Sequence, residues 1–171
     1  MIVALAGIGT AVTLYPVLKR QNEGVALGFV SLRVLEAATI YSGIGSLLSI
    51  VTLRQEAAGT LAIGQALAAQ YYSTFLFGQS LIPAGNALLL GYVLYKSRLL
   101  PRALPVLAFI GAPLLIASWA GTLVGLIEPV SPASAVMALP IALWEFSLGL
   151  YLIIKGFKSF MPKILPLIQK P

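Results

Sequence analysis

The run GVALGFVSLRVLEAATIYSGIGSLLSIVTL, residues 24–53, is almost entirely apolar, yet it holds two charged residues well inside it. Arg33 and Glu36 stand three residues apart in its segment SLRVLEA, residues 31–37. The run is long enough to cross a bilayer, which takes about 20 predominantly apolar residues in a helix. Ionisable side chains at such a depth are costly, usually face protein or water, and often mark function. The sequence therefore predicts a membrane helix with a charged pair near its middle.

The whole chain shares this apolar character. Of its 171 residues, 59% are hydrophobic and 9% are charged, and the mean hydropathy is +0.97, whereas a soluble domain carries about 25% charged residues. Cysteine and histidine are both absent, which excludes disulfides, thiolate nucleophiles and imidazole metal ligands. We expect one all-α integral membrane domain with no metal and no cofactor, and lipid covering much of its surface.

Charged residues divide the chain into apolar segments. Five spans are predicted over about residues 1–18, 24–53, 73–96, 103–127 and 133–154. Residues 57–95 carry no charge and would form one helix of roughly 60 Å, twice the hydrocarbon thickness, so we expect a break. One interpretation places a short outer or re-entrant helix at 57–70 ahead of the third span; the other makes two spans, 57–77 and 80–97. The basic tail, residues 155–171, is expected to lie along the anionic inner leaflet.

The distribution of basic residues favours five spans with the N-terminus outside. Nine basic residues then lie on the inner side, Arg54 alone lies outside, and Arg33 is within the membrane. The nine are Lys19, Arg20, Lys96, Arg98, Arg102, Lys155, Lys158, Lys163 and Lys170. An extra span would move most of them outside, against the positive-inside rule. The net charge of +6 thus indicates membrane orientation rather than nucleic-acid binding.

The helix rise places four polar residues at one level near the midplane. Arg33 and Glu36 lie about 13 and 18 Å from the inner end of their span, and Asn86 and Glu145 each lie about 15 Å from the inner ends of theirs. One arginine and two glutamates leave a surplus negative charge, so one glutamate is protonated, or a cation or water-filled cavity balances it. The structural interpretation is a buried clamp of paired side chains that fixes the register of the helices. The functional one is a proton or substrate site, which predicts a water-accessible pocket touching Arg33 and Glu145.

A second pattern concerns packing. Ala117, Gly121 and Gly125 form a small-residue ladder on one face of the fourth predicted span. Such ladders allow helices to approach closely, either within one chain or between two copies. We expect packing within the chain, with a homodimer contact as the alternative.

Four stretches resemble a bacterial family of multi-pass membrane proteins named domain of unknown function 4386. They are LYPVLKR (14–20), ALGFVSLRVLE (26–36), GYVLYKSRLLPR (91–102) and LPIALWEFSLGLYLIIKGF (139–157). Arg33, Glu36 and Glu145 fall within them. The resemblance implies a helical fold in a bacterial membrane and no particular activity. Family members usually carry one more span ahead of the position of residue 1, which would put the N-terminus of a longer form inside.

Two functions fit these observations. The first is a non-enzymatic protein of the bacterial inner membrane, an accessory subunit or scaffold that binds lipid and either another membrane protein or a second copy. No phosphate loop, metal-ligand spacing or nucleophile–base pair is present in the sequence. The alternative is a small transporter or proton-coupled carrier that uses the polar layer.

Overall fold

The computed structural model describes residues 1–56 and 60–157 and contains no strand in these ranges. The described residues form six α-helices and one π-helical segment. They are α1 (Ile2–Leu18), α2 (Glu23–Gln55), α3 (Leu61–Leu76), η1 (Phe77–Leu81), α4 (Ile82–Ser97), α5 (Ala103–Leu123) and α6 (Pro132–Lys155). The chain is thus an all-helical bundle, as predicted.

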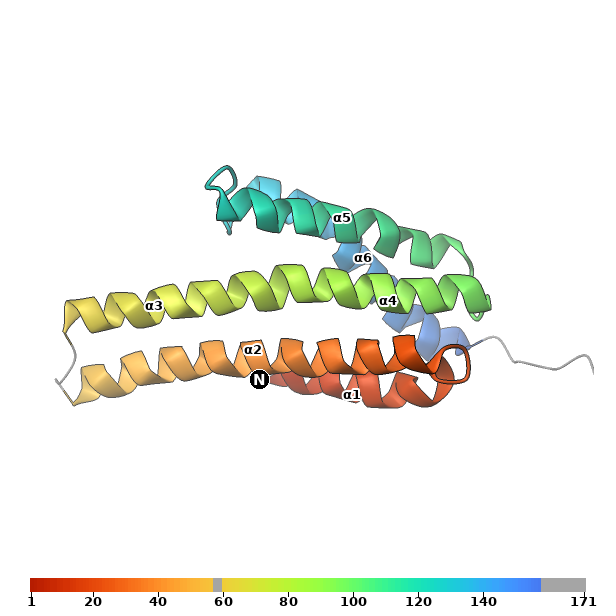
Figure 1. Ribbon diagram of the computed structural model, residues 1–171, viewed down its shortest axis with the longest axis horizontal. Helices are drawn as coiled ribbons and strands as arrows, with labels where there is room; N and C mark the ends of the chain where they lie inside the picture. Colours follow the sequence, from red (N-terminus) through yellow and green to blue (C-terminus); the bar gives the residue numbers. More distant parts are fainter. Residues whose placement is uncertain (57–59, 158–171) are drawn as a thin grey trace, which may run out of the picture.

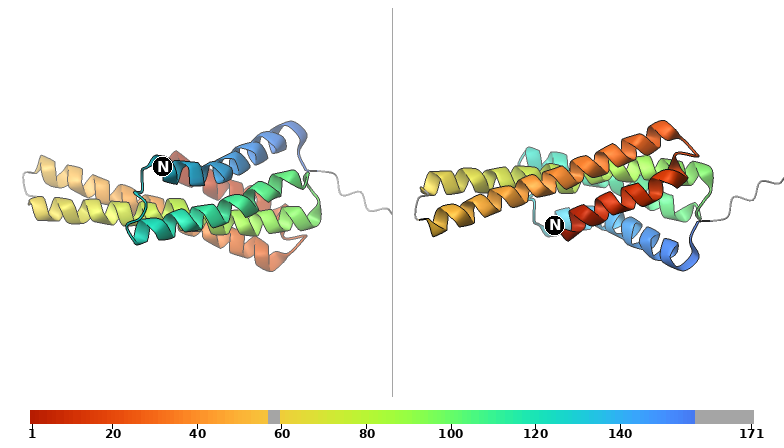
Figure 2. Two further views of the ribbon diagram at one scale, coloured as in Figure 1. Left: turned by 90° about the horizontal axis from the view of Figure 1, so that it is seen from above. Right: turned by 90° about the horizontal axis from the view of Figure 1, so that it is seen from below.

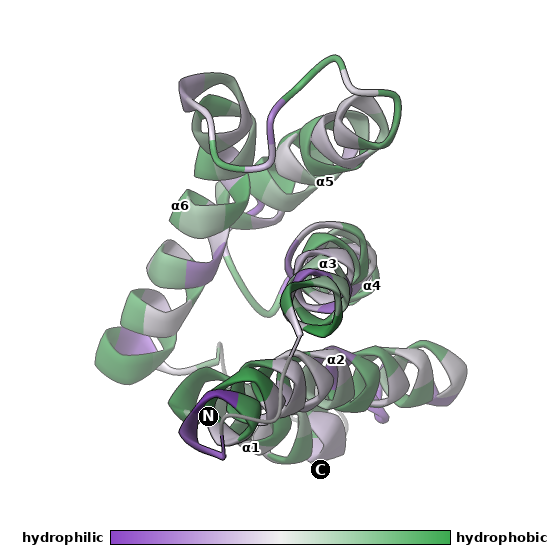
Figure 3. Cartoon of the chain, turned by 90° about the vertical axis from the view of Figure 1, so that its left-hand side faces the viewer, coloured by the Kyte–Doolittle hydropathy of each residue, from purple (hydrophilic) through white to green (hydrophobic). Residues whose placement is uncertain are grey.

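The helices stack in three tiers. α2 packs against α1 on one side and against α3 and α4 on the other, and α5 packs between α4 and α6. Figure 1 shows the α3–α4 rod between the α1–α2 tier and α5, with α6 crossing behind. Viewed along the long axis, α6 leans from α5 toward α1 (Figure 3). Phe29, Leu94 and Trp144 are among the largest fully buried side chains and belong to one hydrophobic core cluster.

Four helical stretches are long and apolar enough to cross a membrane: Glu23–Gln55, Leu61–Ser97, Ala103–Leu123 and Pro132–Lys155. α1 is apolar but has only 17 residues, about 26 Å at the α-helical rise. Large apolar side chains such as Ile2, Phe146 and Ile153 are at least 71% exposed. An outer surface of this kind suits lipid rather than water, and the fold is that of a helical membrane bundle.

The structure corrects the expected break of the helix within the uncharged residues 57–95. Residues 61–97 form one continuous rod, and no separate outer helix at 57–70 precedes a span starting at 73. The reason lies in η1, because Pro83 lacks an N–H and its ring would crowd the carbonyl of Gln79 in a regular α-helix. The π-helical bonding of residues 77–81 changes the spacing at that point, so the rod continues.

The excess length of this rod is taken up by a projecting hairpin. α3 and the second half of α2 extend well beyond α1, α5 and α6 (Figures 1 and 2), and α3 contains no buried residue. Residues 57–59, where the outer helix was expected to begin, and 158–171 of the expected basic tail lie outside the described residues.

Basic side chains gather at one end of the bundle, which we call the basic end. The α1–α2 loop, the α4–α5 loop and the C-terminus of α6 all lie there (Figure 1). These elements contribute Lys19, Arg20, Lys96, Arg98, Arg102 and Lys155. Arg54 lies at the opposite end, close to the tip of the hairpin.

Candidate functional site

The structure brings the four polar residues of the predicted layer into one chain of contacts. Arg33 on α2 donates from Nη1 to Glu36 Oε2 at 3.0 Å and from Nη2 to Glu145 Oε1 on α6 at 3.0 Å. Asn86 on α4 donates from Nδ2 to the same Glu36 oxygen at 2.8 Å. Three helices are therefore linked through one guanidinium and one amide.

Local helical geometry positions these groups. Arg33 and Glu36 are an i,i+3 pair, so both side chains lie on one face of α2. The Arg33 guanidinium also lies 5.7 Å from the centre of the buried Phe29 ring, one helical turn earlier. The planar fork of arginine can bind two carboxylates at once, which is how Arg33 joins α2 to α6.

Burial is uneven along this chain of contacts. Glu36 and Asn86 are buried, at 8% and 1% exposure, whereas the Glu145 side chain is 46% exposed and that of Arg33 13%. Within the described residues, Arg33 Nε and Asn86 Oδ1 are buried without a hydrogen-bond partner. A clamp serving packing alone would be expected to satisfy every buried polar atom. The layer is therefore an imperfect clamp with one accessible carboxylate.

That carboxylate lies in a groove between α1 and α6, of about 450 Å³. Arg33 and Glu145 are the charged residues on its wall. Its wall also includes Thr10, Thr13, Leu14, Trp144 and Leu148. α1 packs on α2 and α6 packs on α5, so the groove separates the first helix from the last. Its wall includes both Arg33 and Glu145, the two residues that the functional interpretation expected a pocket to touch.

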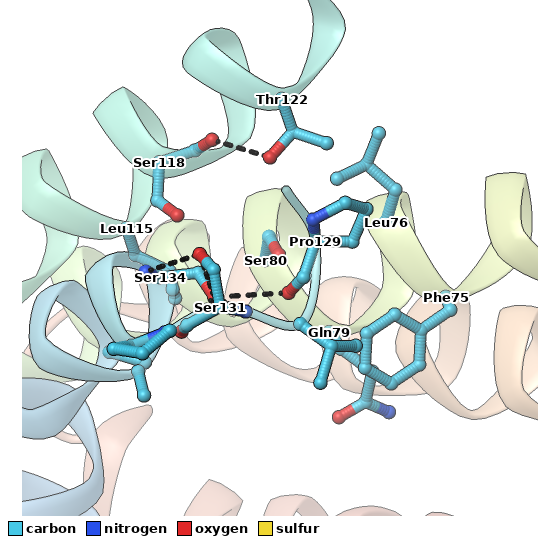
Figure 4. Close-up of a pocket in the computed structure, with 14 residues that line it drawn as sticks. Phe75, Leu76, Gln79, Ser80, Leu115, Ser118, Thr122, Pro129, Ser131 and Ser134 are labelled. Atoms are coloured by element: carbon cyan, nitrogen blue, oxygen red, sulfur yellow. Dashed lines mark hydrogen bonds between the residues drawn. The ribbon is translucent and has the colours of Figure 1, made fainter. Parts of the chain in front are cut away.

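A second cavity, of about 520 Å³, lies toward the opposite end of the bundle. Figure 4 shows polar side chains from η1, α5 and the start of α6 converging on it. Ser131 and Ser134 form the capping box that begins α6, while Gln79 and Ser80 come from the π-helical segment. α6 thus lines this cavity with its first half and the groove with its second half, and Pro140 lies between them.

The small-residue ladder is not a continuous packing face. α5 ends at Leu123, four residues before the predicted end, and Gly125 lies beyond it with φ +75°. Gly125 N–H donates to Thr122 O, and Leu126 N–H donates to Gly121 O, the pair of bonds that defines a Schellman cap. A Cβ on Gly121 would lie 2.7 Å from Ile127 Cδ1 of the same turn, while Ala117 is exposed on α5. Gly121 and Gly125 therefore serve the turn, which corrects the ladder interpretation for them.

Sequence reasoning did not assign Thr10 and Thr13 to the site. They are polar residues three apart in an otherwise apolar helix, and this spacing could have indicated one face of α1. Their relation to Glu145 depends on α1 and α6 lying on either side of one groove, and these helices come from opposite ends of the chain. No local pattern encodes that neighbourhood.

These features define a class: a small helical membrane bundle with an Arg–Glu layer opening into a lateral groove. The chain belongs to the family described as domain of unknown function (DUF4386), whose model matches residues 1–156. The curated proteins and the solved structures contain no significant match to the chain. The described residues contain no group of three or more His, Cys, Asp or Glu side chains placed to hold a metal ion.

Proposed function

We propose that the protein is a small, non-enzymatic membrane carrier whose substrate site is the groove between α1 and α6. The observation that carries this proposal is the half-exposed Glu145 carboxylate at membrane depth, ion-paired to Arg33. A charge facing hydrocarbon costs about 2.5–3.5 kcal/mol on insertion scales. A group that enters the groove and contacts Glu145 would offset that cost, so the site favours occupancy.

The positions of the two cavities support transport of a substrate rather than binding alone. The groove and the second cavity lie along opposite halves of α6, and Pro140 falls between the two halves. Proline removes one helical hydrogen bond and permits a bend. The π-helical segment η1 lines the second cavity, and π segments often occur at functional sites. α6 is the element that would move relative to α1 during exchange.

Membrane orientation belongs to the same proposal. Six described basic residues occupy the basic end, against Arg54 near the hairpin tip. The positive-inside rule then puts the basic end in the cytoplasm of a bacterial inner membrane, with the hairpin on the outer side. The protein would cross the membrane several times.

Proton-driven transport in proteoliposomes tests the proposal. Purified protein, reconstituted with an imposed pH gradient, is offered an amine, a carboxylate and a neutral probe of equal size. We expect gradient-dependent accumulation of at least one probe, abolished by Glu145→Gln and preserved in Glu128→Gln, which alters an exposed carboxyl in the α5–α6 turn. Accumulation equal to that of empty vesicles for all three probes would overturn the carrier proposal. If Glu145→Gln instead lowers the yield of folded protein, the structural clamp gains support.

A second candidate is an accessory subunit or scaffold, and the projecting α2–α3 hairpin favours it. α3 buries none of its residues in the chain, and both helices extend past the rest of the bundle (Figure 2). Such a projection offers a contact surface to another membrane protein. Purification from native membranes tests it: a stoichiometric partner, lost when residues 44–76 are replaced by a short loop, is the expected result, and recovery of the chain alone argues against it.

A further inference from the structure

The polar layer beside the groove contains one cation and two carboxylates. Arg33 pairs with Glu36 and with Glu145, and of these three residues Arg33 and Glu145 line the groove wall. Glu36 is buried and accepts from both Arg33 and Asn86. The accessible charge is therefore that of Glu145. Its Oε1 accepts from Arg33, and its Oε2 forms no hydrogen bond within the described residues.

The hydroxyl groups on the facing wall have their donors already engaged. Thr10 donates to Ala6 O and Thr13 donates to Gly9 O, each at 2.8 Å. A hydroxyl has one donor and two acceptor lone pairs, so both threonines can only accept hydrogen bonds from a molecule in the groove. Both side chains are exposed and line it. The groove thus presents three acceptor oxygens, from Thr10, Thr13 and Glu145.

Donors available to an anion are correspondingly scarce. Each terminal nitrogen of Arg33 donates one of its two N–H groups to a carboxylate, and its Nε is buried. A carboxylate or phosphate in the groove would meet the like charge of Glu145 without a free hydroxyl donor. A neutral apolar molecule would give Glu145 Oε2 no hydrogen-bond donor.

We propose that the groove binds a protonated amine carried on an apolar body. The ammonium group would lie among Glu145, Thr10 and Thr13. It would supply N–H donors and a positive charge that balances the second carboxylate of the layer. The apolar body would lie against Leu14 and Leu148, which also line the groove. The volume of about 450 Å³ falls within the usual range for small-molecule sites, about 300–1,000 Å³. This inference rests on the proposed function, because it names the substrate class of the same site.

Tryptophan fluorescence offers a direct test. The chain has two tryptophans, and Trp144 lines the groove while Trp119 packs on Phe77 in another part of the bundle. A Trp119→Phe background in phosphatidylcholine nanodiscs leaves Trp144 as the reporter. The probes are 2-phenylethylamine, 3-phenylpropionate and 2-phenylethanol, which share one aromatic body and differ in charge.

We expect a saturable fluorescence change with the amine and none with the other two probes. Glu145→Gln should weaken amine binding by about tenfold or more, the effect of losing a charge-assisted hydrogen bond. Glu128→Gln is the matched control and should leave binding unchanged. Thr10→Val with Thr13→Val keeps the shape of the wall but removes two acceptors, and should weaken binding by about threefold to tenfold. The double threonine variant provides the test if Glu145→Gln fails to fold.

The outcomes separate this inference from the proposed function. Equal or tighter binding of 3-phenylpropionate, or amine binding that neither Glu145→Gln nor the threonine pair weakens, overturns the amine site. Saturable amine binding without gradient-driven uptake of any probe supports the amine site and overturns the carrier. Gradient-driven uptake of the carboxylate probe alone supports a carrier and overturns its assignment to amines.

Discussion

Arg33 and Glu145 lie 112 positions apart in the chain, yet Arg33 Nη2 donates to Glu145 Oε1 at 3.0 Å. Their ion pair joins α2 to α6 across a groove, although α6 otherwise packs on α5. The same guanidinium binds Glu36. A single cation thus compensates two carboxylates at membrane depth, and its loss should affect the whole bundle.

Replacing Arg33 by leucine should destabilise the protein strongly. Removing one partner of a buried ion pair leaves an uncompensated charge and typically costs about 3–5 kcal/mol. The measurement is thermal unfolding of the detergent-solubilised protein, followed by size-exclusion chromatography. Arg54→Leu removes an exposed arginine at the hairpin end and should change the midpoint little. Equal midpoints for the two variants would show that the ion pairs contribute nothing to stability, while recovery in an Arg33→Leu, Glu36→Gln, Glu145→Gln triple variant would confirm the electrostatic cause.

Asn86 is the second support of Glu36, and its replacement by leucine should also destabilise the fold. The amide donates to Glu36 Oε2 at 2.8 Å in a site that is 1% exposed. Leaving a buried acceptor without this donor costs about 1–3 kcal/mol, and more when the acceptor is charged. Chemical unfolding by denaturant titration in detergent measures the change. Gln70→Leu, at an exposed position on α3, is the control, and a loss no greater than in this control would contradict the assigned role.

The polar layer could be predicted from sequence because each residue of a helix adds a nearly constant rise. The depth of a residue in the membrane can therefore be counted from the end of its span. Arg33, Glu36, Asn86 and Glu145 share a level by counting alone, and their proximity needs only the packing of α2 against α4 and the lean of α6. The local sequence does not show which helix surfaces remain apart from each other in the folded bundle. The groove exists because α1 and α6 separate, and no spacing within either helix specifies this. The continuous α3–α4 rod was likewise hidden, because Pro83 alone does not show whether the helix ends or continues through a π turn, and that turn also needs Gly78 close to Thr39 of α2.

Gly78 should be intolerant of even a methyl group. A Cβ there would overlap the Thr39 side chain of α2, so η1 and α2 approach too closely for any side chain at this position. Gly78→Ala should therefore lower the unfolding midpoint despite the intrinsic helix preference for alanine, which is worth about 1 kcal/mol. Gly64→Ala is a matched control on α3, where a Cβ meets nothing within 4 Å. That variant should be neutral or slightly stabilising. A Gly78→Ala midpoint at or above that of Gly64→Ala would mean that the two helices separate without loss.

The proposed orientation can be tested with two matched cysteine variants, because the natural chain has no cysteine. Gln21 lies in the α1–α2 loop at the basic end and Gln55 at the end of α2 near the hairpin tip, and both are exposed. If the basic end is cytoplasmic, a membrane-impermeant maleimide should label Gln55→Cys in intact cells and Gln21→Cys only after permeabilisation. The reverse pattern would place the basic end outside, contrary to the positive-inside rule. Labelling of both sites in intact cells would put the two ends of α2 on one side of the membrane and contradict its assignment as a span.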